Sequence, residues 1–186
     1  MAKRIYYALY SKSAVVEFEE KPKIRQRNGW IEKTGALKVR FATLESGENH
    51  KELLSQMNPA ECYKFYAKAN KVIKGQSNRE EVFVHKQQNQ QDAPTKRLII
   101  EKWERNGRKG FSVILVVKQG EQTEKINVAC SGEELVALAD WMRELNTLLR
   151  YKEVIKVEEE EGGDEPPPQP DDEVPVDDED LPDDIF

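Results

Sequence analysis

Cationic and aromatic side chains alternate in two separate parts of this 186-residue sequence. Lys and Arg neutralise phosphates, and flat aromatic rings stack on unpaired bases, so both parts suit the binding of single-stranded nucleic acid. Each tryptophan in them also suits core or rim packing. The first part contains Lys23, Arg25, Arg27, Trp30, Lys33, Lys38 and Arg40. The second contains Lys96, Arg97, Lys102, Trp103, Arg105, Arg108 and Lys109.

The last residues of the chain carry a different chemistry. Asp183 and Asp184 precede Ile185 and Phe186, so an acidic string ends in two apolar side chains at a carboxylate. Such a tip suits a partner's apolar pocket rimmed by basic residues. Residues 158–186 hold no Lys or Arg and too few apolar residues for a core, so we expect a disordered protein-interaction tail.

The net charge of −6 is the sum of two opposite parts. Residues 158–186 carry fifteen of the 35 acidic groups and none of the 29 Lys and Arg residues, which leaves residues 1–157 near +9. A basic body with an acidic tail is the charge asymmetry of a nucleic-acid binder. In the free protein the tail is expected to fold back onto the body as a mimic of phosphates.

Other kinds of site find little support in the sequence. There is no Gly-rich phosphate loop or nucleophile–base motif, so we do not expect an enzyme or a cofactor. With two histidines and with Cys62 and Cys130 far apart, we expect no metal site, but two buried thiols in a reducing compartment. No apolar run is long enough to span a membrane, and no signal peptide is recognised. We therefore expect a cytoplasmic protein.

The elements that position these residues begin with strands. Residues 5–10 and 14–18 are strand-like, a basic segment follows with a turn at Asn28-Gly29, and residues 35–44 alternate between apolar and cationic positions. Residues 50–57 are expected to form one more short strand. A helix then begins at Asn58 and Pro59 with a capping box closed by Glu61, and it ends at Gly75.

The second half has the same order of elements. Strands are predicted at 82–84, 96–103, 111–118 and 121–130, with a tight turn at Asn106-Gly107. A second helix begins at Ser131, and its buried stripe is predicted to be Leu135, Leu138, Ala139, Met142, Leu145 and Leu149.

Near-equal spacing of these features predicts a duplicated unit. The two Arg-Asn-Gly turns are 78 positions apart, and the two helix caps are 73 apart. We therefore predict an α+β fold of two units, each a four-stranded antiparallel sheet followed by a helix. The first repeat covers about residues 3–76 and the second about 80–152, within a nucleic-acid-binding body of residues 1–157.

Two resemblances follow from these features. The acidic tip resembles that of bacterial and phage single-stranded-DNA-binding proteins, which implies recruitment of replication, recombination and repair proteins. Here Ile185 and not proline precedes the final Phe186, which leaves the partners open. The body resembles the PUR-repeat and Whirly-type single-strand-binding architecture by its order of elements. The alternative, the OB-fold barrel of the bacterial proteins, has no duplicated helix.

The sequence thus predicts a non-enzymatic protein that binds single-stranded DNA with little sequence preference. An RNA-binding regulator or RNA chaperone is the alternative, because such sheets bind either polymer. A double-strand binder is disfavoured, because no recognition helix is visible. We expect a monomer with internal pairing or a homodimer, with Trp141 at a helix–helix or subunit contact.

Overall fold

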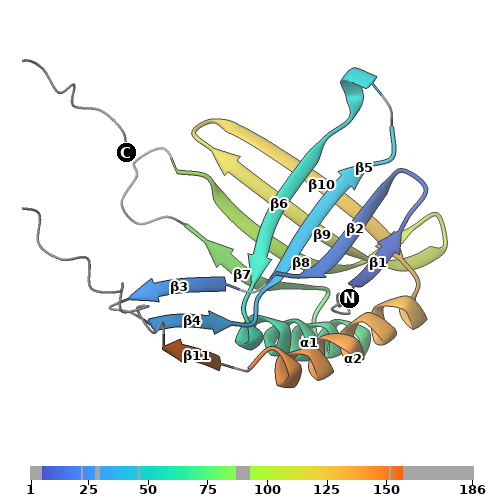
Figure 1. Cartoon of the computed structure of the whole chain (residues 1–186). Coiled ribbons are helices and arrows are strands. Elements are labelled where there is room, and N and C mark those ends of the chain that lie inside the picture. The colour runs from blue at the N-terminus through green and yellow to red at the C-terminus, as the bar shows by residue number, and fades with distance from the viewer. Residues whose placement is uncertain are drawn as a thin grey trace, which may run out of the picture.

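The computed structural model describes residues 6–21, 23–27, 30–45, 47–86, 93–150 and 152–156. Two four-stranded antiparallel sheets cross one another, two helices run side by side beneath them, and a small third sheet lies next to the helices (Figure 1). This is the α+β architecture of two sheet-and-helix units that the sequence predicts. It consists of open sheets and not of the single closed barrel of the OB fold, so the alternative architecture is excluded.

The first sheet has the strand order β1-β2-β5-β6. In β5 the apolar residues alternate with half-exposed Lys38 and Arg40, which confirms the predicted two-faced strand. A 3-10 turn, η1 (Gly47–Asn49), connects the last two strands. The four strands are β1 (Tyr6–Tyr10), β2 (Ala14–Glu20), β5 (Leu37–Thr43) and β6 (Glu52–Met57).

The second sheet has the order β10-β9-β8-β7. Its long central hairpin turns at Asn106 and Gly107, whose φ values of 50° and 73° are those of the predicted tight turn. Because both residues require positive φ, Asn-Gly suits this position. The four strands are β7 (Arg79–His85), β8 (Thr95–Arg105), β9 (Arg108–Gln119) and β10 (Gln122–Cys130).

A helix follows each sheet, and each begins with the predicted capping box. The Asn58 side chain accepts a hydrogen bond from the Glu61 backbone at the start of α1 (Pro59–Ile73). Ser131 accepts one from the Glu134 backbone at the start of α2 (Gly132–Leu148). These reciprocal bonds satisfy backbone donors that the first turn of a helix leaves without partners.

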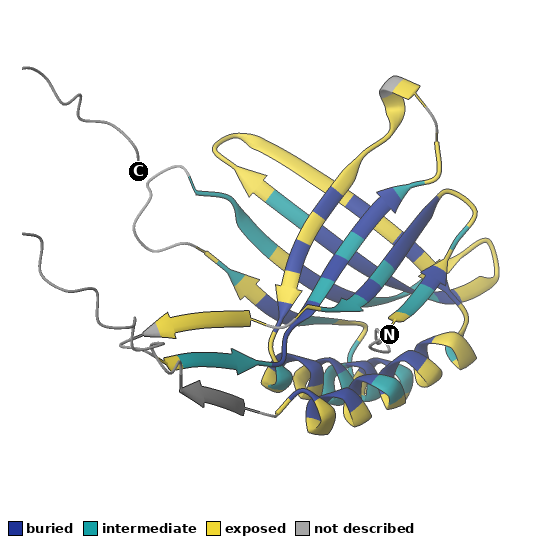
Figure 2. Cartoon of the chain, in the orientation of Figure 1, coloured by how far each residue is buried: buried dark blue, intermediate teal, exposed yellow. Residues whose placement is uncertain are grey.

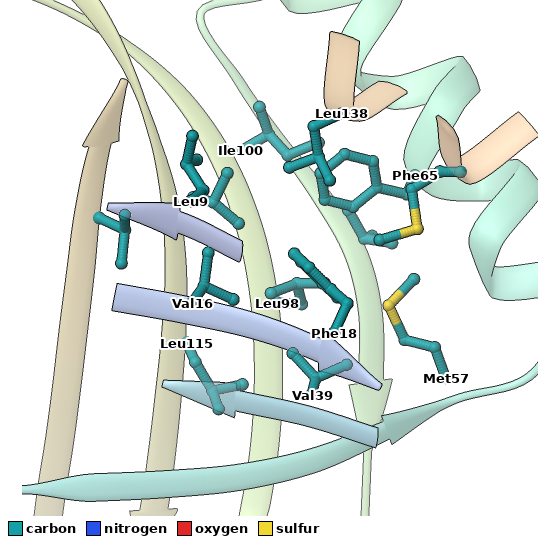
Figure 3. Close-up of a cluster of buried hydrophobic side chains, with 14 of the residues drawn as sticks. Leu9, Val16, Phe18, Val39, Met57, Phe65, Leu98, Ile100, Leu115 and Leu138 are labelled. Atoms are coloured by element: carbon teal, nitrogen blue, oxygen red, sulfur yellow. The ribbon is translucent and has the colours of Figure 1, made fainter. Parts of the chain in front are cut away.

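One core joins both units. Figure 3 shows its side chains converging from both sheets and both helices, and Figure 2 shows buried residues along the strands of both sheets and along the helices. The predicted stripe of α2 is buried, and so are both cysteines. Trp141 was expected at a helix–helix or subunit contact. Its ring packs on the first sheet, 5.0 Å from the Tyr7 ring and 6.0 Å from the Phe18 ring.

The small sheet, defined here as β3 (Lys23–Arg27), β4 (Trp30–Thr34) and β11 (Lys152–Lys156), has the order β11-β4-β3. Its hairpin is inserted between β2 and β5, so the first Arg-Asn-Gly turn belongs to an extra hairpin and not to the first sheet. The two Arg-Asn-Gly turns therefore do not occupy equivalent positions in the two units, although their spacing along the sequence suggested that they would. Residues 28–29 themselves lie outside the described residues.

Strand β11 was not anticipated, because residues 152–156 pair with β4, more than a hundred positions earlier in the chain. Non-local pairing of this kind leaves no periodic signal within a five-residue segment. It brings the end of the described chain back to the β3–β4 hairpin.

Candidate nucleic-acid interface

A cleft of about 660 Å³ lies between the first sheet, the second sheet and the base of the small sheet. The two sheets contribute their edge strands here, β6 from the first and β7 from the second. We call it the lysine cleft. Its lining residues are Lys21, Lys23, Lys38, Leu54, Ser55, Gln56, Met57, Asn58, Glu61, Val84, His85, Lys86, Pro94 and Lys96.

Five lysines from both halves of the chain surround this cleft. Lys96 of β8 reaches across to β6, where its Nζ donates a hydrogen bond to the Leu54 carbonyl oxygen at 2.8 Å. Glu61 is the single carboxylate in the lining. Its Oε1 lies 2.6 Å from His85 Nε2, and its Oε2 accepts from the Asn58 backbone at 2.9 Å. The cleft therefore presents a strong positive charge and suits polyanions.

The floor of the lysine cleft is formed by buried residues, whereas most of its lysines are exposed. Ser55 and Glu61 are 5% and 9% exposed, and Met57 is fully buried. At the mouth, the apolar side chains of Leu54 and Val84 are 41% and 50% exposed. Phosphate-binding groups thus stand beside apolar surface that an unpaired base can contact.

One face of the small sheet carries the remaining charge of the first predicted group. Strand alternation places Lys23 and Arg25 on the same face of β3, and the backbone of Arg27 pairs with that of Trp30 in the antiparallel register. Trp30 is 45% exposed. Lys23 belongs both to this face and to the lysine cleft, so the two surfaces are continuous.

Arg40, another member of the first group, is held in an ion-pair ladder on the outer face of the first sheet. Its two terminal nitrogens lie 2.7 Å from Glu17 Oε2 and 2.9 Å from Glu52 Oε2. The hydrogen bond from Arg40 lowers the pKa of Glu52 below its ordinary value. Tyr6 donates to Glu17 at 2.8 Å, and burial together with this carboxylate raises the pKa of Tyr6. Lys33 is half-buried on β4.

The second predicted group is divided along β8. Lys96 lies in the lysine cleft, but Arg105 and Arg108 stand exposed at the β8–β9 turn. An extended strand rises about 3.3 Å per residue, so Lys96 and Arg105 are roughly 30 Å apart. Residues that are close in the sequence are thus far apart in the sheet.

Other members of the second group have partners within the protein. Arg97 forms an ion pair with Glu81, and Lys109 Nζ lies 3.5 Å from Glu104. Trp103 Nε1 donates to the Phe111 carbonyl oxygen at 3.1 Å, and its ring lies over Gly110. Trp103 thus packs against its own hairpin, whereas Trp30 remains accessible. Lys102 is half-buried.

Sequence reasoning missed several cleft residues, namely Lys21, Lys86, Ser55, Glu61 and His85. Their meeting depends on how the edges of two separate sheets approach one another, and nothing local in the sequence reports it.

Residues 158–186, including the predicted tip at Asp183, Asp184, Ile185 and Phe186, lie outside the described residues. Within the described part of the chain, no three His, Cys, Asp or Glu side chains are grouped as metal ligands. No helix in that same part is long and apolar enough to cross a membrane.

Comparison with solved structures identifies the fold. WHY1 from Arabidopsis thaliana matches with a TM-score of 0.59 at 15% identity, over 81% of this chain and 87% of that chain. WHY3 from Arabidopsis thaliana matches with a TM-score of 0.60 at 17% identity, over 80% and 90% of the two chains. The plant transcriptional regulator PBF-2 gives 0.56 at 17% identity, over 80% and 84%. No protein-family model matches, and no curated protein sequence matches. The three structures are Whirly proteins, and at these identities the similarity concerns the fold.

Proposed function

Because the chain has the Whirly-type fold, we propose that it binds single-stranded DNA, with little sequence preference, through the lysine cleft and the adjoining face of the small sheet. The DNA backbone lies along the five cleft lysines and continues past Lys23 to Arg25. Trp30 stacks on a base where the strand leaves the cleft.

The observation that carries this proposal is the convergence of lysines from both halves on one cleft. Lys21, Lys23 and Lys38 come from the first half, and Lys86 and Lys96 from the second. Like charges repel one another, so five ammonium groups around one cleft favour an anionic ligand that spans several of them. A polyphosphate chain has this property.

Apolar surface beside the lysines favours a single strand over a duplex. Leu54 and Val84 are exposed at the mouth of the cleft, and Trp30 is exposed on the small sheet. In a duplex the flat faces of the bases are stacked and out of reach, whereas a single strand offers them to apolar and aromatic side chains. Both helices bury their apolar stripes in the core, so neither resembles a recognition helix.

Binding to oligonucleotides of one length tests this proposal. The full-length protein is titrated into fluorescently labelled dT25, a 25-base-pair duplex and rU25, and anisotropy is followed at several salt concentrations. We expect dT25 to bind most tightly, with a salt slope of about −3.5 if all five cleft lysines neutralise phosphates. Preference for the duplex contradicts the proposal, and preference for rU25 favours the RNA-binding alternative.

The acidic tip is proposed to recruit proteins of replication, recombination or repair. Ile185 and Phe186 enter an apolar pocket of the partner, while Asp183 and Asp184 meet basic residues around it. Deleting Ile185 and Phe186 is expected to abolish binding to such a partner on a sensor surface. Replacing Val174 and Val176 by Ala is the matched control and leaves binding unchanged. Equal binding by both variants and the parent contradicts this role.

A further inference from the structure

His85 lines the lysine cleft, and two contacts hold its ring in place. The ring stacks on that of Phe83, with the centroids 4.0 Å apart and the planes within 8° of parallel. Its Nε2 lies 2.6 Å from Glu61 Oε1. Phe83 is buried, whereas the His85 side chain is 37% exposed, so the accessible part of the ring lies away from Phe83. The ring is thus fixed on one side and open to a ligand on the other.

The contact with Glu61 determines which ring nitrogen of neutral His85 carries the proton. An ionised carboxylate accepts hydrogen bonds and cannot donate them, so the proton of the neutral ring lies on Nε2. Nδ1 then has only a lone pair, which repels a phosphate oxygen. A second proton turns Nδ1 into a donor and gives the ring a positive charge. Protonation therefore makes His85 a further cation of the lysine cleft.

The charged groups around His85 couple its protonation to the ligand in the cleft. Glu61 favours the protonated ring, whereas the lysines disfavour another positive charge beside them. Phosphates that neutralise these lysines remove the repulsion, so a bound polyanion favours protonated His85. The ammonium groups that line the cleft with His85 are those of Lys21, Lys23, Lys38, Lys86 and Lys96.

We propose that His85 is a phosphate-binding residue of the lysine cleft that acts only when it is protonated, so that single-stranded DNA binds with uptake of a proton. Because the bound protein then holds more protons than the free protein, affinity rises as the pH falls. Histidine ordinarily changes its charge between about pH 5 and pH 8, whereas Lys and Glu ordinarily do so outside about pH 6–8. This inference rests on the proposed binding of single-stranded DNA and adds a dependence on pH to it.

The affinity of the full-length protein for dT25 at two pH values tests this role of His85. Anisotropy titrations are made at about pH 6 and about pH 8, at matched ionic strengths. We expect the parent to bind about three- to tenfold more tightly at the lower pH, the usual effect of one added hydrogen bond. Its salt slope is expected to steepen there by up to about 0.7, the value for one more neutralised phosphate. His85→Gln is expected to bind equally at both pH values, with the affinity of the parent at the higher one.

His50→Gln is the matched control, because His50 is the other histidine of the chain and is exposed outside the cleft. It is expected to keep the pH dependence of the parent. His85→Arg separates the loss of a charge from a disturbance of the cleft, since arginine is charged at both pH values and also stacks on aromatic rings. We expect it to bind at both pH values about as tightly as the parent does at the lower one.

Four results overturn this role of His85. These are equal affinities of the parent at the two pH values, an undiminished pH dependence in His85→Gln, an equal loss of that dependence in His50→Gln, or a His85→Arg protein that binds no more tightly than His85→Gln. In each case single-strand binding itself stands. If the parent protein does not bind dT25 at either pH, the proposed function fails as well.

Discussion

Arg40 illustrates what sequence reasoning cannot see at the scale of single residues. The alternation of residues 35–44 correctly predicts that Arg40 lies on the outer face of its strand, where a cation suits a phosphate. The alternation does not show that Glu17 and Glu52 flank it on the neighbouring strands. A charge's partner depends on strand register, which a single sequence does not specify.

This ladder gives the protein a pH dependence. The hydrogen bond from Arg40 depresses the folded-state pKa of Glu52, so the ionised carboxylate stabilises the fold above the ordinary glutamate pKa. That contribution is lost as the pH falls through the depressed value. We expect the melting temperature of the parent to fall more steeply below about pH 4.5 than that of Arg40→Gln. Arg105→Gln, at an exposed turn, should follow the parent, and parallel curves for all three proteins would refute this account of Arg40.

Trp30 and Trp103 are indistinguishable in the sequence, since each stands among cations. The structure separates them, because Trp30 is exposed, whereas Trp103 donates to Phe111 and covers its own hairpin. We expect Trp30→Ala to lower dT25 affinity about five- to a hundredfold, as for the loss of one stacked base, with little change in melting temperature. Trp103→Ala should lower the melting temperature and leave affinity nearly unchanged. The opposite assignment of the two effects would show that Trp103 provides the stacking surface.

Local signals account for what was predicted at the scale of elements. Both capping boxes, the buried stripe of the second helix and the Asn106-Gly107 turn are encoded within a few neighbouring residues, and each is present. The inserted β3–β4 hairpin and β11 were missed, because their places depend on pairing between distant segments. The lysine cleft was missed for the same reason, because it forms where the edges of two separate sheets come together.

The matched capping boxes make a direct test of this local encoding. Asn58 and Ser131 make the same reciprocal bonds at the starts of α1 and α2. Replacing either by Ala should lower the free energy of unfolding by about 1 kcal/mol, the usual cost of losing such a cap. Urea denaturation measures it. A loss below a few tenths of a kcal/mol for either variant would show that the cap does not hold that helix.

Gly35 shows how the elements constrain one another. A Cβ on this residue would lie 2.3 Å from the Leu149 carbonyl oxygen, where β4 runs into β5 and α2 ends. Backbone atoms on both sides leave little room for adjustment, and overpacking of this kind typically costs about 1–3 kcal/mol. The glycine therefore allows the small sheet to join the first sheet close to the end of α2.

Charge is the property of the whole molecule that the sequence reports best, because it requires only counting. Residues 1–157 are near +9 and residues 158–186 carry fifteen acidic groups. If the acidic segment competes with DNA for the cleft lysines, a chain ending at Val157 should bind dT25 more tightly than the full chain at low salt. Salt screens such competition, so the two affinities should converge as its concentration rises. Equal affinities and equal salt slopes would rule out the competition.

Charge reversal in the lysine cleft tests the central claim most directly. Lys38→Glu/Lys96→Glu is compared with Lys12→Glu/Lys64→Glu, two exposed lysines outside the cleft, so both full-length variants have the same net charge. The claim predicts that the cleft variant loses at least tenfold in dT25 affinity and that its salt slope becomes shallower by about 1.4, or 0.7 for each lost contact. The control should keep the parent slope. Equal affinities and slopes for the two variants would contradict the claim.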